Sequence, residues 1–99
     1  MEVTFATDDL QSLAFVDGHR TKVPREIVKK YVQRIDLIIA APDERDFARL
    51  RALNFERMKG GRSHQHSMRL NDQWRLILEL KGEGRNKVVH IVSIEDYHR

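Results

Sequence analysis

The sequence predicts an α+β fold in which two N-terminal helices pack on a small, mainly antiparallel sheet of four to five strands. The apolar residues recur with a helical period in the first part of the chain and with a strand-like period from Leu53 onward. Runs of strands that follow helices are typical of α+β domains. The chain has 99 residues, of which 40% are hydrophobic and 33% charged. That length and composition predict one globular domain over residues 1–99.

The first two elements are a short strand over residues 2–6 and a short helix. Thr7 is the expected N-cap of this helix, because its hydroxyl can accept a backbone N–H that has no partner in the first turn. Asp8 and Asp9 follow in that turn, where the helix dipole favours negative charge. Asp17-Gly18 is expected to end the helix.

A longer helix is predicted between Pro24 and Ala41-Pro42, since proline suits the first position of a helix and disfavours helical backbone in the residue before it. Asp43 is expected to cap one further turn. The apolar residues of the long helix share one face: Val23, Ile27, Val28, Tyr31, Val32, Ile35, Ile38 and Ile39. The residues expected to face solvent are Arg25, Lys29, Lys30, Gln33 and Arg34.

Four strand-like runs follow, at residues 53–57, 65–70, 74–80 and 87–94. The last run, KVVHIVSI, lacks polar alternation, so we expect an interior strand that is covered on both faces. Its His90 is expected to be a hydrogen-bonded core residue, and Trp74 a core residue.

Charge is distributed unevenly along the chain. Residues 1–50 hold eight Lys/Arg and nine Asp/Glu, net −1, whereas residues 51–99 hold ten and six, net +4. A basic half favours nucleic acid or another polyanion as a ligand, although such an excess is also common on solvated surfaces. There is no cysteine, which excludes disulfides and thiolate chemistry. The N-terminus resembles no signal peptide and no apolar run is long enough for a membrane span, so we expect a soluble cytoplasmic protein without a membrane partner.

The register of the hairpin over residues 65–80 follows from side-chain alternation. A three-residue loop at 71–73 gathers the apolar side chains on one face and places Arg69 directly opposite Arg75 on the other. Like charges in that arrangement cost stability, and departures from such local rules tend to mark functional sites.

Two explanations of the facing arginines stay open. A bound anion would relieve the repulsion, and Lys59 and Arg62 in the adjoining glycine loop could contact the same anion. Alternatively, each arginine pairs with a neighbouring acid such as Glu56 or Glu79.

Metal binding is not expected. His64 and His66 lie two residues apart, which suits a metal on a strand, but no third ligand has suitable spacing. His66 is expected to be a half-buried strand histidine.

Three segments of the second half resemble a known family in order and spacing: residues 58–62 (MKGGR), 65–76 (QHSMRLNDQWRL) and 95–98 (EDYH). Together they resemble the HigB group of RelE-type bacterial toxins, also called the plasmid maintenance killer family. Its pattern is LKGxRxGxxSIRINxQWRI followed by a C-terminal DYH. The helical first half agrees with the family mainly in layout.

The resemblance implies a RelE-like fold and a type II toxin, an endoribonuclease that cleaves messenger RNA, usually in the A site of the 30S ribosomal subunit, and so inhibits translation. It implies no metal and no cofactor. The implied partner is a HigA-like helix-turn-helix antitoxin, which neutralises the toxin and represses the shared operon, so that operator DNA is contacted only through the antitoxin.

The resemblance also implies roles for individual residues. The basic positions Lys59, Arg69 and Arg75 match the family, and with Arg62 they are the expected RNA phosphate ligands. The terminal group matches as Asp96, Tyr97 and His98, with His98 as the titrating group, Asp96 orienting it, and Tyr97 stacking on a base or donating its hydroxyl.

One position departs from the family. Many HigB members have a histidine where this chain has Glu56, so we treat Glu56 as a candidate general base.

Two alternatives remain at this stage. The first is a ParE-like toxin that inhibits gyrase without cleaving RNA, and the second is a basic module that binds RNA without catalysis. The terminal Asp-Tyr-His favours the nuclease.

Overall fold

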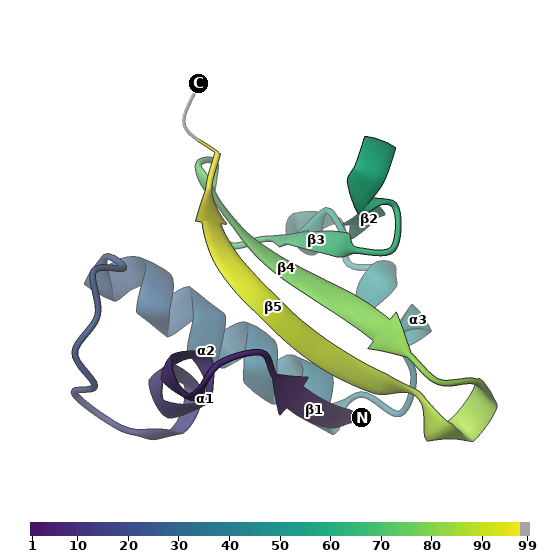
Figure 1. The fold of residues 1–99 in the computed structure, drawn as a ribbon, viewed down its shortest axis with the longest axis horizontal. Coiled ribbons are helices and arrows are strands. Elements are labelled where there is room, and N and C mark those ends of the chain that lie inside the picture. The colour runs from purple at the N-terminus through teal and green to yellow at the C-terminus, as the bar shows by residue number, and fades with distance from the viewer. Residues whose placement is uncertain (98–99) are drawn as a thin grey trace.

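The computed structural model describes residues 1–97, and its sheet has five strands in the order β1-β5-β4-β3-β2 (Figure 1). β1 runs parallel to β5 and the other neighbours are antiparallel. The α+β prediction is therefore confirmed. The strands are β1 (Glu2–Phe5), β2 (Glu56–Arg57), β3 (His66–Arg69), β4 (Trp74–Lys81) and β5 (Val88–Asp96). The helices are α1 (Asp8–Phe15), α2 (Arg25–Ala40) and α3 (Arg45–Ala48).

The helices begin where the capping residues predict. The Thr7 hydroxyl accepts the Leu10 backbone N–H at 3.2 Å, which caps α1. Pro24 is the N-cap of α2. Asp43 accepts the Arg45 backbone N–H at 3.0 Å at the start of α3. Residues 41–44 separate this short helix from α2.

One face of the sheet packs against α1 and α2 and forms the core. Tyr31 lies at its centre, fully buried, and donates its hydroxyl to the Leu10 carbonyl at 2.7 Å, which ties α2 to α1. The buried residues of this core are Leu13, Ala14, Ile27, Tyr31, Ile35, Ile38, Ala41, Phe47, Leu53, Met68, Leu70, Leu76, Leu78, Val89 and Ile91.

The predicted hairpin register is confirmed. Met68 pairs with Leu76 and Arg69 with Arg75, and the Leu70 backbone N–H donates to the Trp74 carbonyl at 2.9 Å. The three-residue loop therefore puts the apolar side chains toward the helices. Trp74 is partly buried against the core.

β5 is an interior strand, as predicted, but it is not covered equally on both faces. Val89 and Ile91 are buried, whereas His90 is half-buried on the opposite face and shares a 2.7 Å hydrogen bond with Thr4. His90 is therefore hydrogen-bonded but not a core residue. A β-bulge opposite the Ile77/Leu78 step leaves Val92 without a partner in the ladder.

Two further expectations need correction. The strand predicted over residues 53–57 is reduced to the two residues of β2, because Leu53 ends a 3-10 turn and Asn54 adopts a left-handed conformation with φ of 42°. Arg34 was expected to face solvent. It is half-buried, burial lowers its pKa, and its Nε donates to the Arg69 carbonyl at 3.3 Å.

Candidate active site

The sheet face that points away from the helices carries the candidate functional residues, and we call it the outer face. Its members follow from the cross-strand pairing, because each pair shares a side of the sheet. Ser67 and Ile77 are buried there although they lie outside the helix-side core. The outer face comprises Ser67, Arg69, Arg75, Ile77, Ser93 and Glu95.

Arg69 and Arg75 face each other on the outer face, and each is bonded to a carboxylate. Arg75 Nη2 donates to Glu56 Oε1 at 3.0 Å and to Ser67 Oγ at 3.0 Å. Arg69 Nη2 donates to Asp72 Oδ1. In this state neighbouring acids offset the repulsion between the arginines, which is the second of the two explanations considered for the sequence. Glu56 is one of the predicted acids, and Asp72 takes the place of Glu79.

Arg75 is the most enclosed of these cations. Its side chain is 12% exposed, compared with 42% for Arg69. Within residues 1–97, Arg75 Nε is buried and has no hydrogen-bond partner. An unpaired buried donor costs about 1–3 kcal/mol, and groups of this kind call for a functional or structural explanation.

The carboxylates that hold the two arginines are themselves exposed. The Glu56 side chain is 60% exposed and that of Asp72 94% exposed. Ion pairs in such positions are weak, so an incoming anion can displace them. Glu56 also lies where a base could act, since it contacts the guanidinium that would hold the phosphate.

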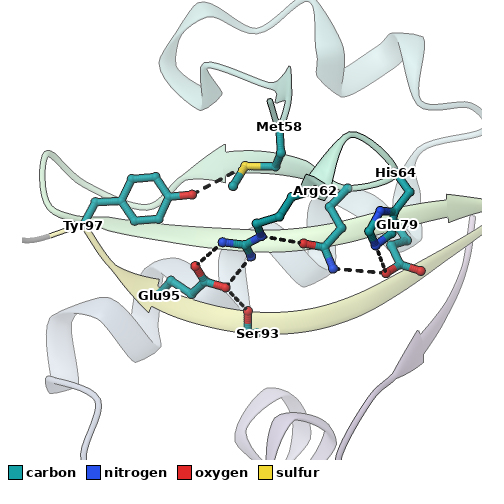
Figure 2. Close-up of polar contacts among 8 residues, drawn as sticks. Met58, Arg62, His64, Glu79, Ser93, Glu95 and Tyr97 are labelled. Carbon is teal, nitrogen blue, oxygen red and sulfur yellow. Dashed lines mark hydrogen bonds and ion pairs between the residues drawn. The ribbon is translucent and has the colours of Figure 1, made fainter. Parts of the chain in front are cut away.

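The glycine loop, residues 58–65, joins β2 to β3. Arg62, a predicted phosphate ligand, lies in a 3-10 turn of this loop and forms two bonds to Glu95, from Nη1 to Oε1 at 2.9 Å and from Nη2 to Oε2 at 2.6 Å (Figure 2). Hydrogen bonding to Glu95 raises the pKa of Arg62, and the same bond lowers the pKa of Glu95. Lys59 precedes the turn and is exposed. Of the two loop cations, Lys59 is thus the more accessible.

Glu95 was not singled out from the sequence. The signal for it was indirect: Glu95 stands directly before Asp96-Tyr97-His98, and its partner Arg62 lies 33 residues earlier. The bulge at Val92 is what turns Glu95 to the outer face. In a regular strand Glu95 would share a side with Ile91, which points into the core.

The end of β5 meets the hairpin turn. Asp96 pairs with Trp74 and accepts a 3.0 Å hydrogen bond from Gln73 Nε2. The Tyr97 backbone N–H donates to the Gln73 carbonyl at 2.7 Å, and its hydroxyl donates to Met58 Sδ at 3.5 Å (Figure 2). The Tyr97 side chain is 39% exposed. His98, the predicted titrating group, lies outside the described residues.

The remaining histidines do not gather into a site. His66 stacks on Phe55 with ring centroids 4.9 Å apart, and burial lowers its pKa. His64 lies 3.8 Å from Glu79. Across residues 1–97 there is no group of three or more His, Asp or Glu side chains that could hold a metal ion.

A large cavity lies away from the candidate site residues. A cavity of about 1510 Å³ is lined by α1, α2 and the segment that joins them. Its lining includes none of the predicted site residues, so we place the candidate site on the outer face, where the cations converge. Among the described residues, no helix is long and apolar enough to cross a membrane.

The fold is that of a known class of bacterial toxins. The YoeB/ParE toxin from Agrobacterium tumefaciens superposes with a TM-score of 0.63 over 99% of this chain and 100% of that chain. At 19% sequence identity this likeness establishes a shared fold. Comparison with curated proteins gives no match.

The family follows from the sequence itself. Residues 3–98 match the family model described as the RelE-like toxin of the type II toxin-antitoxin system HigB. The chain therefore belongs to the HigB-like family of RelE-like type II toxins, which confirms the resemblance seen in its motifs. Membership of a type II toxin-antitoxin family also implies an antitoxin partner.

Proposed function

We propose that this protein is a metal-independent endoribonuclease that cleaves messenger RNA on the ribosome and so inhibits translation in the cytoplasm. The observation that carries the proposal is the pairing of Asp96 with Trp74, one residue from Arg75. This pairing, with the Tyr97–Gln73 backbone hydrogen bond, brings Asp96 and Tyr97 to the same end of the sheet as the facing arginines. Family membership supports the same conclusion.

Metal-free cleavage of RNA makes three demands. The ribose 2′-hydroxyl must lose its proton as it attacks phosphorus, the charge that develops on the phosphorane must be stabilised, and the departing 5′-oxygen must gain a proton. On the outer face, two cationic donors, Arg69 and Arg75, lie opposite each other, and the candidate base Glu56 contacts Arg75. Arg69, Arg75 and Lys59 are proposed to bind the phosphate, with Arg62 as a further predicted ligand.

Arg75 is proposed as the main stabiliser of the phosphorane. It is the least exposed of the cations, and a donor in a water-poor position stabilises developing charge more strongly than one in water. A phosphate that binds here replaces Glu56 on the guanidinium. The released Glu56 carboxylate then lies beside the scissile group, where it can accept the 2′-hydroxyl proton.

The terminal residues are proposed to complete the chemistry. His98 is the titrating group that protonates the 5′-oxygen, because a free imidazole titrates near neutral pH. Asp96 orients it or supplements it. Tyr97, which is exposed at the end of the sheet, stacks on a base or donates its hydroxyl.

The antitoxin is proposed to be a HigA-like helix-turn-helix protein. It would neutralise this toxin and repress the operon that encodes both, so that this chain meets operator DNA only through its partner. Co-expression with the neighbouring helix-turn-helix gene should restore growth to cells that express the toxin, and a growth arrest that persists would contradict this partnership.

The nuclease proposal is tested with purified protein, ribosomes and a defined message, and cleavage is mapped by primer extension. We expect the wild-type protein to cut the message, and Arg75→Ala to lower the cleavage rate by about 100-fold or more. His98→Ala and Tyr97→Phe should also slow cleavage. Arg85→Ala is the matched control, since it removes an exposed cation from the turn at the opposite end of β4.

Other outcomes of the same experiment identify the alternatives. An intact message together with inhibited DNA supercoiling by gyrase would indicate a ParE-like toxin. RNA binding without cleavage, abolished by Arg75→Ala but not by His98→Ala, would indicate a non-catalytic RNA-binding module. Either result would reject the nuclease.

A further inference from the structure

All three guanidinium nitrogens of Arg62 donate hydrogen bonds within the protein. Its Nη1 and Nη2 form the parallel pair of bonds to Glu95, and its Nε donates to Gln65 Oε1 at 3.0 Å. A bidentate arginine–carboxylate pair is among the stronger and more directional polar contacts in proteins. RNA phosphate could take the place of Glu95 in this bidentate pair only by displacing the carboxylate.

Glu95 is also held from its own side. Ser93 Oγ donates to Glu95 Oε2 at 2.7 Å, and the Glu95 side chain is 29% exposed. Glu95 thus differs from Glu56 and Asp72, the exposed acids that hold the other two arginines. The network extends to β4, because Gln65 Nε2 donates to Glu79 Oε2 at 3.2 Å. These contacts fasten the 58–65 loop to β4 and β5 (Figure 2).

The fastened loop carries the contact partner of Tyr97. The Met58 backbone N–H donates to the Gln65 carbonyl at 2.8 Å, which closes the base of the loop. At that base, Met58 Sδ accepts the Tyr97 hydroxyl at 3.5 Å. A thioether is a weak acceptor, so this contact alone cannot fix the loop and depends on the loop being held elsewhere.

From these contacts we infer that the Arg62–Glu95 pair positions Tyr97 by holding the 58–65 loop, and with it Met58, against the end of β5. Arg62 and Glu95 are then positioning residues, and the other three cations, Lys59, Arg69 and Arg75, bind the RNA. This inference rests on the proposed nuclease function, and it assigns a role to Glu95, which lies next to the Asp-Tyr-His segment.

The two roles for Arg62 make opposite predictions for Glu95→Gln. If Arg62 binds phosphate, the loss of the competing carboxylate frees its guanidinium, so RNA affinity should rise. If the pair positions Tyr97, the same change loosens the loop and should lower kcat while KM stays unchanged, because misplacing a group slows the chemical step.

The kinetic test compares Glu95→Gln, Arg62→Lys and the double variant in ribosome-dependent cleavage. Arg62→Lys keeps the positive charge but cannot form the bidentate hydrogen bonds to Glu95. We expect each single variant to lower kcat by about 10- to 100-fold, and the double variant to lose no more than either alone. Glu83→Gln is the control, since it removes the same charge from an exposed turn. Unchanged kcat or tighter RNA binding in Glu95→Gln would overturn the inference.

A second readout does not depend on cleavage. In ¹³C-methyl NMR spectra, wild-type Met58 should show a nuclear Overhauser effect to the Tyr97 ring, and Glu95→Gln and Arg62→Lys should lose it while the core methyl signals persist. If this effect survives in both variants, the positioning role is wrong. If wild-type protein fails to cleave RNA, the nuclease function is rejected, and the NMR comparison still decides whether the pair positions Tyr97.

Discussion

Arg69 and Arg75 face each other across β3 and β4, and each is bonded to an acid, Arg69 to Asp72 in the turn between these strands and Arg75 to Glu56 of β2. The outer face is therefore locally neutralised in the structure. Since the acids are exposed, they can leave when phosphate arrives. Under the proposed function the same acids would weaken RNA binding, because phosphate would have to displace them.

Removal of one such acid should strengthen RNA binding. Asp72→Asn leaves Arg69 without its carboxylate, so we expect the Kd for a short single-stranded RNA at low salt to fall by a factor of about two to five, the range of an exposed ion pair. Fluorescence anisotropy measures this, with Glu83→Gln as the control for net charge. An unchanged or higher Kd would show that Arg69 does not bind RNA phosphate.

The buried hydroxyl of Tyr31 should contribute measurably to stability. Burial raises the pKa of Tyr31 well above its usual value, so the group stays a neutral donor to the Leu10 carbonyl. Tyr31→Phe leaves that carbonyl without this donor, and should lower the free energy of unfolding by about 1–2 kcal/mol in urea titrations. Tyr97→Phe, which changes an exposed hydroxyl, should have no such effect. Equal losses in both variants would contradict this account.

Stability should depend on pH through His66. Burial, with a smaller contribution from Arg57, lowers the folded-state pKa of His66 below its unfolded value of about 6.5. As pH falls below 6.5 the unfolded chain takes up the proton first, so the free energy of unfolding decreases until the folded-state pKa is passed.

The measurement compares urea unfolding at two pH values, one above and one below this unfolded pKa. His66→Phe keeps a ring against Phe55 but cannot titrate, so it should lose less stability on acidification than the wild-type protein. His64→Gln, a change at an exposed histidine, should behave like the wild type. An undiminished loss in His66→Phe would assign the pH dependence to another group.

Two glycines should respond differently to alanine. Gly82 has φ of 83°, and a Cβ there would lie 2.5 Å from the Asn86 carbonyl oxygen. Gly82→Ala should therefore destabilise the protein by more than about 1 kcal/mol. A Cβ on Gly61 meets nothing within 4 Å, and Gly61→Ala should be close to neutral. Thermal unfolding of both variants tests this, and equal melting temperatures would show that the Gly82 turn relaxes at little cost.

The sequence predicted the features that depend on local alternation. The hairpin register follows because only one loop length collects Leu70, Met68 and Leu76 on one side, and the structure has that register. The strand predicted over residues 53–57 was mostly wrong, because that prediction also relied on alternation alone. Leu53 and Phe55 alternate like strand residues, but Phe55 instead packs edge-on against Phe47, with centroids 5.3 Å apart, from irregular backbone.

The candidate site could be predicted only in part. The arginines were identified from their register, whereas the Arg62–Glu95 pair joins segments 33 residues apart and depends on a bulge that reverses the alternation of β5. Nothing in the KVVHIVSI run marks Val92 as the bulged residue. The acid that holds Arg69 was missed because Asp72 lies in the turn itself and not on a neighbouring strand.

The position of β5 between β1 and β4 has a consequence for synthesis of the chain. β1 is translated first, yet the strand beside it in the sheet is the last one made. The sheet can therefore be completed only after residue 96 has left the exit tunnel of the ribosome. A nascent chain whose β5 is still inside the tunnel would therefore lack the assembled outer face.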